Sequence, residues 1–254
     1  MKIRIKFAKY GAVKFIGHLD VMRYFQKAIR RAGIDVAYSE GYSPHQIMSF
    51  AAPLSVGHTS EGEYFDIEVN SFEGIEDLVN RLQAVMVEGI DILDAKLLEK
   101  KEKNAMASVA AASYLVFFRD ESILPEKWQD GLAAYYGQDV IPVVKQTKKG
   151  EKQINLKESI YDLQICQNRS YSREHSRLYG NICEGLARMP ETEVYLLLNA
   201  SSGGNIKPSF VLDSFFRTIS FELPPFALIV HRLETYQNFG TEEERRLVPL
   251  LWEK

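Results

Sequence analysis

The chain has 254 residues, of which 46% are hydrophobic and 11% aromatic, and its formal net charge is -3. These values suit one large or two small globular domains with a hydrophobic core. They exclude a helical membrane protein, because no apolar run approaches the roughly 18–20 residues that span a bilayer. The two cysteines, Cys166 and Cys183, are too few to hold an iron–sulfur cluster by themselves.

The N-terminal residues and the cysteine content predict a cytoplasmic protein. The chain begins with an alternating pattern over residues 2–7 and has no apolar segment typical of a signal peptide. A secreted chain of this size usually carries more than two cysteines, so we expect a reducing compartment.

Charge is distributed unevenly along the first half of the chain. Residues 1–50 carry nine basic side chains and three acidic ones, a balance of +6. Residues 51–98 carry ten acidic side chains against Arg81 and Lys96, a balance of -8. Two interpretations are open: the asymmetry directs an electric field at a partner, or the two stretches lie side by side and neutralise each other.

The first hundred residues predict the element order β-α-β-β-α-β. Residues 2–7 alternate between basic and apolar side chains, which is typical of a half-buried strand. A helix follows and ends at Gly33, with Arg30 and Arg31 in its last turn, where cations favour the helix dipole. Its predicted apolar face comprises Leu19, Met22, Phe25, Ile29 and Ala32. Further strands are expected at 34–38, 47–50, 64–69 and 90–98, and a second helix at 73–87.

This order predicts an α+β fold with two ferredoxin-like (βαββαβ-type) halves, the second of them degenerate. The first domain is expected at residues 1–99. A hydrophilic stretch followed by small residues makes 100–111 the expected linker to a second domain at 112–254. That domain is expected to contain strands at 114–118, 194–199 and 227–236, helices at 124–136 and 208–217, a hairpin of 141–145 with 152–156, and an irregular segment at 167–190.

The first helix carries a basic stripe. On a helical wheel, its cations share an arc of about 100° that lies nearly opposite the apolar face. These cations are Arg23, Lys27, Arg30 and Arg31. Arginine forks match phosphate oxygens in paired hydrogen bonds, so the stripe can follow a phosphodiester backbone. The alternative is a solvated surface, with some of these charges paired with acids of residues 61–77.

The loop after this helix combines groups that stack and groups that donate hydrogen bonds. Its candidate nucleic-acid-binding residues are Tyr38, Ser39, Tyr42, Ser43 and His45. Tyrosines stack on unpaired bases, and the hydroxyl and imidazole groups can donate to phosphate. The alternative is an ordinary loop, because Gly, Pro and Ser are common in loops of every kind.

Other residues suggest chemistry in two places. His18 and His45 are candidates for general acid–base work on RNA, with local hydrogen bonding as the alternative. Ser202, Gly203 and Lys207 lie in a Gly-rich turn that enters a helix and could bind a phosphate, although a plain strand-to-helix turn explains the same residues. We expect no metal site, because nothing in the spacing requires three or four ligands to converge.

Nearly the whole chain resembles the radical SAM-linked proteins, a family of unknown function. The matching segments are FIGHLDVMR (15–23), RRAG (30–33), YSEGYSPH (38–45), SFAAPLSVG (49–57), EYFD (63–66), TKKGEK (147–152) and SSGGNIKP (201–208). The chain differs from the family pattern at Gly17, where Ser is more frequent, and at Gln46-Ile47, where Pro-Lys is frequent.

The resemblance implies a domain fused to, or encoded beside, a radical SAM enzyme. That enzyme would carry the iron–sulfur cluster and S-adenosylmethionine, and we expect this chain to bind no cofactor itself. We expect an accessory module that presents an RNA, such as tRNA or rRNA, to the enzyme. Two alternatives remain: a protein–protein adaptor without nucleic acid contact that uses the acidic region 61–77, and an RNA-processing enzyme that uses His18 or His45.

Overall fold

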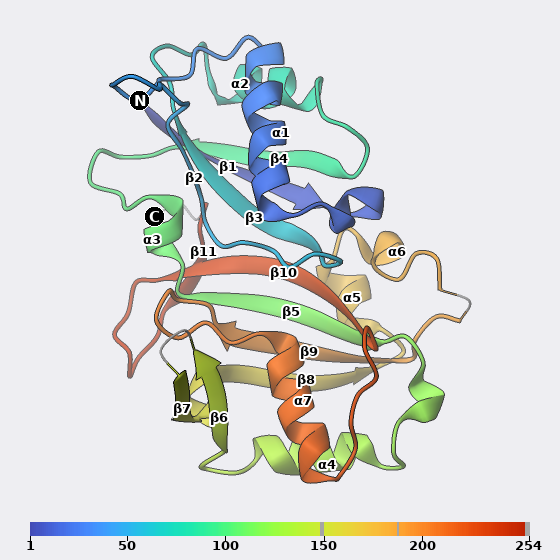
Figure 1. Ribbon diagram of the computed structural model, residues 1–254. Helices are drawn as coiled ribbons and strands as arrows, with labels where there is room; N and C mark the ends of the chain where they lie inside the picture. The colour runs from blue at the N-terminus through green and yellow to red at the C-terminus, as the bar shows by residue number, and fades with distance from the viewer. Residues whose placement is uncertain (148–149, 187, 252–254) are drawn as a thin grey trace. The chain divides into compact units, whose positions relative to one another are not determined.

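The computed structural model describes residues 1–147, 150–186 and 188–251 and has a mixed α+β fold (Figure 1). The chain divides into two compact units, Met1–Ala110 with Arg232–Lys254, and Ala111–His231. The C-terminal segment therefore groups with the first unit, whereas the expected domains were 1–99 and 112–254. Whether either unit folds as an independent domain stays a prediction. None of the described helices combines the length and apolar character needed to cross a bilayer.

The first unit contains the predicted β-α-β-β-α-β order and a set of later elements. Its strands are hydrogen-bonded in the order β4-β1-β3-β10, with β2 on β3 and β11 on β10. Strand β1 is antiparallel to both of its neighbours. The elements are β1 (Lys2–Lys9), the 3-10 helix η1 (Gly11–Phe15), α1 (His18–Arg31), β2 (Met48–Phe50), β3 (Thr59–Glu68), α2 (Ile75–Gln83), β4 (Ile90–Leu97), α3 (Ala105–Ser108), most of β10 (Leu228–Asn238) and β11 (Leu247–Pro249).

Two expectations for this unit were wrong in detail. The predicted strand 34–38 is reduced to isolated bridges, Val36 with Val69 and Tyr38 with Gln46. Leu19, expected on the apolar face of α1, is exposed. The helical wheel explains this exposure. The buried residues Val21, Phe25, Ala28 and Ile29 share an arc of about 100°, and Leu19 lies about 80° beyond the edge of that arc.

Aromatic packing fixes α1 against the sheet. Phe25 of α1 lies with its ring centroid 4.8 Å from that of Phe7 on β1 and 4.6 Å from that of Phe65 on β3. Phe50 of β2 stacks on Phe65 at 5.1 Å. All four rings are buried, and such pairs contribute about 0.5–1.5 kcal/mol each beyond the burial of their area. Because this face is occupied, the opposite face of α1 carries its polar residues.

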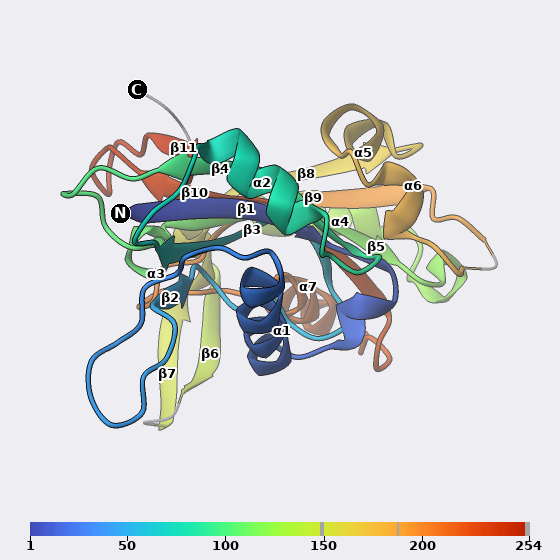
Figure 2. The same cartoon turned by 90° about the horizontal axis from the view of Figure 1, so that it is seen from above.

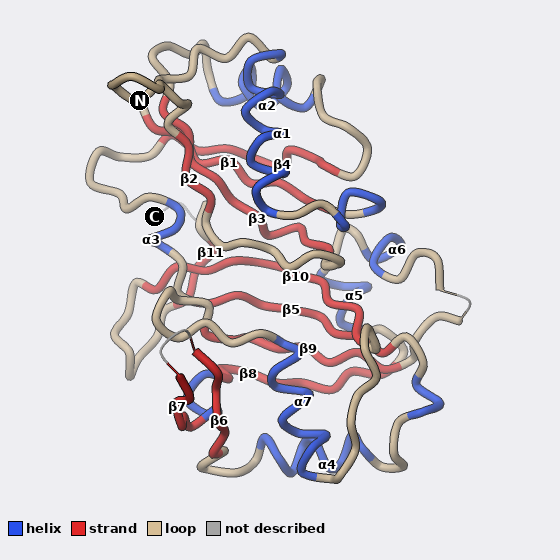
Figure 3. Tube along the Cα trace, viewed as in Figure 1, coloured by secondary structure: helices blue, strands red, loops and turns tan. Residues whose placement is uncertain are grey.

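The second unit has a three-stranded antiparallel core, β5-β9-β8, and a separate two-stranded sheet, β6-β7 (Figure 3). The expected hairpin is confirmed as β6 and β7, but Lys148 and Lys149 lie outside the described residues. Strand β8 was not expected, and the supposedly irregular 167–190 contains two short helices. The elements are β5 (Ala111–Phe118), α4 (Trp128–Tyr136), β6 (Pro142–Thr147), β7 (Gly150–Asn155), β8 (Ile160–Gln167), α5 (Ser170–His175), α6 (Tyr179–Ile182), β9 (Thr192–Asn199), α7 (Pro208–Thr218) and the start of β10.

Gly62 permits a close backbone approach in the first unit. A Cβ at this position would lie 2.4 Å from Glu234 Cα, and the Gly62 carbonyl accepts a 2.7 Å hydrogen bond from the Thr235 hydroxyl. We expect Gly62→Ala to destabilise the protein by about 1–3 kcal/mol, because backbone atoms must move apart to admit the methyl group. Urea unfolding measures this change. Gly203→Ala is the control, since its added Cβ has no neighbour within 4 Å; equal losses from both variants would contradict the explanation.

Candidate nucleic-acid interface

The four predicted cations of α1 all reach the surface. Arg23, Lys27, Arg30 and Arg31 are exposed, while Val21, Phe25, Ala28 and Ile29 are buried. The helix therefore packs with one side and presents the four cations on the other, as its sequence periodicity indicated.

Few protein groups engage these cations. Arg23 forms an exposed 3.4 Å ion pair with Asp20 on the same helix. Arg31 donates a 3.2 Å hydrogen bond to the Val85 carbonyl, and its guanidinium lies 5.8 Å from the ring centroid of Tyr24. Within the described part of the chain, the side chains of Lys27 and Arg30 make no hydrogen bond or ion pair. An exposed pair such as Arg23–Asp20 contributes about 0–1 kcal/mol, so a stronger anion can displace it.

The acids of residues 61–77 engage other cations. Asp66 pairs with Arg4 at 2.8 Å, Glu63 with Arg232 at 2.8 Å, and Asp77 with Arg81 at 3.1 Å. Among the residues that the structure describes, none of these acids pairs with the four cations of α1. Acids of this segment therefore neutralise basic side chains of β1, but they do not neutralise the four cations of α1.

The loop from Tyr38 to Gln46 leaves the end of α1, runs outward and returns to β2 (Figure 2). Its base is closed by hydrogen bonds between Ser39 and His45. The Ser39 amide donates to the His45 carbonyl at 2.8 Å, and the Ser39 hydroxyl lies 2.8 Å from His45 Nδ1. Tyr42 at the tip is fully exposed, and Ser43 and Tyr38 are also exposed. The loop thus holds two aromatic side chains accessible to a ligand.

Gln46 ties this loop to α1, and sequence reasoning missed it. Its side-chain amide donates a 3.1 Å hydrogen bond to the Gln26 carbonyl in α1 and lies 3.5 Å from the Tyr38 hydroxyl. The residue is only 5% exposed. The contact therefore joins the base of the loop, through Tyr38, to the middle of α1.

Lys9 fixes the segment that leads into α1. Its buried ammonium donates to the carbonyl of Ile16 at 2.8 Å, one residue before Gly17 and the start of the helix. Burial lowers the pKa of Lys9, against the opposing effect of the Glu63 carboxylate. This lysine was counted in the basic balance of the first fifty residues, but it acts inside the protein and not on its surface.

The two candidate catalytic histidines occupy separate settings. His18 is the first residue of α1, and its ring packs edge-on against Phe50 at 5.3 Å. His45 is held by Ser39. No contact between His18 and His45 is found in the described residues, and these residues hold no cluster of three or more His, Cys, Asp or Glu side chains suited to a metal ion. The geometry therefore offers local packing for His18 and a local hydrogen bond for His45.

The candidate phosphate site lies in the second unit. Ser202 and Gly203 are exposed in the turn after β9, and Lys207 precedes the first residue of α7. No side chain caps this helix end. Lys207 lines a cavity together with residues of β6, whereas Ser202 and Gly203 do not line it.

A family model described as "Uncharacterized protein conserved in bacteria (DUF2344)" matches residues 2–208. A search of curated proteins finds no match to the chain. The match covers the basic helix, the loop after it and the turn before α7, while the link to radical SAM enzymes stays a prediction. The chain therefore belongs to this conserved bacterial family, DUF2344.

Proposed function

We propose that this protein binds RNA through a helix–loop surface. This surface comprises Arg23, Lys27, Arg30, Arg31, Tyr38, Ser39, Tyr42, Ser43 and His45. The observation that carries the proposal is the exposure of four cations on one side of α1, without carboxylate partners from the neighbouring acidic segment among the described residues. Tyr38 and Tyr42 stand beside them as platforms for unpaired bases.

The proposed role is that of an accessory module for a radical SAM enzyme. The basis is the resemblance of the sequence segments to radical SAM-linked proteins. In this role the chain holds a tRNA or rRNA, while the partner carries the iron–sulfur cluster and S-adenosylmethionine. The matching segments 15–23, 30–33 and 38–45 contain eight of the nine residues of the helix–loop surface, all except Lys27, so the resemblance and most of the exposed charge concern the same residues.

Salt dependence tests the RNA-binding role directly. Each phosphate neutralised on a single strand contributes about -0.7 to the slope of log K against log salt concentration. Four cations therefore predict a slope of about -3 in a filter-binding titration with tRNA or rRNA fragments. A protein that retains no RNA even at low salt does not have the proposed function.

Tyr42 provides a test of base stacking. We expect Tyr42→Ala to weaken binding of single-stranded RNA by about 1–3 kcal/mol, while thermal stability stays unchanged because the side chain is fully exposed. Fluorescence anisotropy with a labelled oligonucleotide measures the loss. Phe226→Ala is a matched control, since Phe226 is an exposed aromatic residue of the second unit. If both substitutions weaken binding equally, stacking at Tyr42 is not the cause.

A protein–protein adaptor is the second candidate function, and an exposed apolar patch favours it. Phe15, Leu19 and Val56 are 62%, 61% and 58% exposed. The Gly57 amide donates to the Lys14 carbonyl at 2.8 Å, which places the segments that carry Phe15 and Val56 next to each other. The acidic region proposed for this role is less available, because Glu61, Glu63 and Asp66 are buried. If the chain is an adaptor without nucleic acid contact, the native protein should retain no RNA, and Phe15→Ser with Leu19→Gln should abolish co-purification of the radical SAM enzyme.

We also infer a ferredoxin-like arrangement in each unit. In the first, the sequence order β-α-β-β-α-β and the antiparallel pairings of β1 with β3 and β4, and of β2 with β3, support it. In the second, β5, α4, β8, β9, α7 and β10 follow the same chain order when the β6–β7 hairpin and the short helices α5 and α6 are set aside. Backbone nuclear Overhauser contacts across the strand pairs of each unit would test the strand directions.

A further inference from the structure

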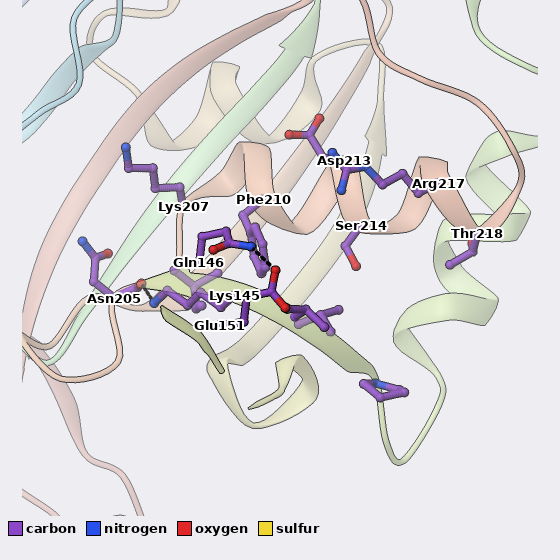
Figure 4. Close-up of a pocket in the computed structure, with 14 residues that line it drawn as sticks. Lys145, Gln146, Glu151, Asn205, Lys207, Phe210, Asp213, Ser214, Arg217 and Thr218 are labelled. Atoms are coloured by element: carbon purple, nitrogen blue, oxygen red, sulfur yellow. Dashed lines mark hydrogen bonds between the residues drawn. The ribbon is translucent and has the colours of Figure 1, made fainter. Parts of the chain in front are cut away.

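The second unit contains a cavity of about 860 Å³ that the helix–loop surface does not use. Three segments far apart in the sequence line it: the β6–β7 hairpin, the turn at 205–207 and one side of α7 (Figure 4). Ligand sites in proteins typically enclose about 300–1,000 Å³, so the cavity can hold a molecule the size of a nucleotide. Two of the three segments border or overlap the family-like sequences 147–152 and 201–208.

The lining combines an aromatic surface with hydrogen-bonding groups. The half-buried Phe210 directs its ring toward the hairpin, beside Gln146 and Glu151, in Figure 4. Gln146 donates a 2.6 Å hydrogen bond to the Glu151 carboxylate. Val144 adds apolar surface from the same strand. These side chains can pack against the flat ring of a base and offer both hydrogen-bond donors and acceptors to its edge.

Two lysines place positive charge at the same end of the cavity. Lys145 donates a 2.7 Å hydrogen bond to the Asn205 carbonyl, which leaves its ammonium beside the turn that precedes α7. Lys207 follows in that turn and is exposed. The start of the 11-residue helix α7 adds the partial positive charge of its dipole. On the other side, Asp213 and Arg217 lie one helical turn apart on α7.

We propose that this cavity binds one nucleotide, with its phosphate near Lys145 and Lys207 and its base against Phe210. The inference rests on the proposed function, because the nucleotide would belong to the RNA that the helix–loop surface retains. A free nucleotide has the same chemistry, and the experiment distinguishes the two sources. An unpaired nucleotide is the fitting unit, since a base within a duplex is stacked and paired and could not lie against a single aromatic side chain.

The test compares variants for binding of three probes: adenosine 5′-monophosphate, uridine 5′-monophosphate and a single-stranded RNA of about 12 nucleotides. We expect Lys207→Glu, Lys145→Glu and Phe210→Leu each to weaken RNA binding by about tenfold. Lys127→Glu is the matched control, because Lys127 is an exposed lysine of the second unit that does not line the cavity. Circular dichroism and thermal melting establish that each variant is folded; Lys207 is exposed, so its substitution tests the site even where Phe210→Leu perturbs packing.

The outcomes separate the two proposals. Loss of RNA binding on charge reversal in α1, with no effect of the cavity variants, overturns the cavity proposal and leaves the helix–loop surface intact. If RNA binding is lost in the cavity variants but not on charge reversal in α1, the helix–loop surface is not the RNA-binding site. Weakened monophosphate binding in these variants, without any RNA retention by the native protein, assigns the cavity to a free nucleotide. If Lys127→Glu has the same effect as Lys145→Glu, the overall charge of the second unit explains the data and the cavity assignment is wrong.

Discussion

Reversing the four cations of α1 is expected to remove most of the RNA affinity. The variant carries Arg23→Glu, Lys27→Glu, Arg30→Glu and Arg31→Glu. Because about four phosphates are then no longer neutralised, the slope of log K against log salt should become less negative by about 3, and affinity at low salt should fall at least about a hundredfold. The fold should survive, because all four side chains are exposed and the buried side of the helix is untouched.

The control for this experiment changes the net charge by the same amount elsewhere. Lys100, Lys101, Lys103 and Lys127 are exposed and lie outside the helix–loop surface. Their replacement by Glu lowers non-specific attraction to RNA equally, but it leaves α1 intact. Filter binding across a salt series should therefore show a large difference between the two quadruple variants. Equal affinities would mean that overall charge, and not this surface, retains the RNA.

Removing the buried arginine of β1 is expected to have the largest effect on stability. Arg4 is 0% exposed, and its guanidinium donates to the Asp66 carboxylate at 2.8 and 3.1 Å and to the Lys103 carbonyl at 2.8 Å. Asp66 also accepts from the Ala105 amide at 2.7 Å. Arg4→Met leaves this carboxylate buried without its cation, which costs about 3–5 kcal/mol. Chemical denaturation measures the change in the free energy of unfolding.

A neighbouring pair on the same two strands provides the control. Lys2 and Glu68 lie 3.7 Å apart with both side chains over one third exposed, so Lys2→Met should change stability by no more than about 1 kcal/mol. A double variant, Arg4→Met with Asp66→Leu, should recover part of the loss because no isolated charge remains. The recovery is incomplete, since the Ala105 amide and the Lys103 carbonyl lose their partners. If Arg4→Met costs no more than Lys2→Met, the buried pair is not the stabilising element.

The local periodicity of the sequence was sufficient to predict the main features of α1 and β1. A repeat of 3.6 residues placed Phe25 and Ile29 on one side of the helix and the four cations on the other, and Gly33 ended it with a φ of 64°. These features depend on residues within a few positions of one another. Strand β8 was missed for the opposite reason: its alternation is irregular, and pairing with β9 about thirty residues later is what makes it a strand.

The sequence by itself determined which charges exist, and only the tertiary structure decided which of them face water. Arg4 and Lys9 look as basic in the sequence as Lys27, but Arg4 meets Asp66, 62 residues away, and Lys9 is buried beside the start of α1. Likewise, Gln46 joins the loop to Gln26, and the hairpin meets α7 around a cavity. Burial of a charge depends on groups brought in from distant segments, and no local pattern contains that information.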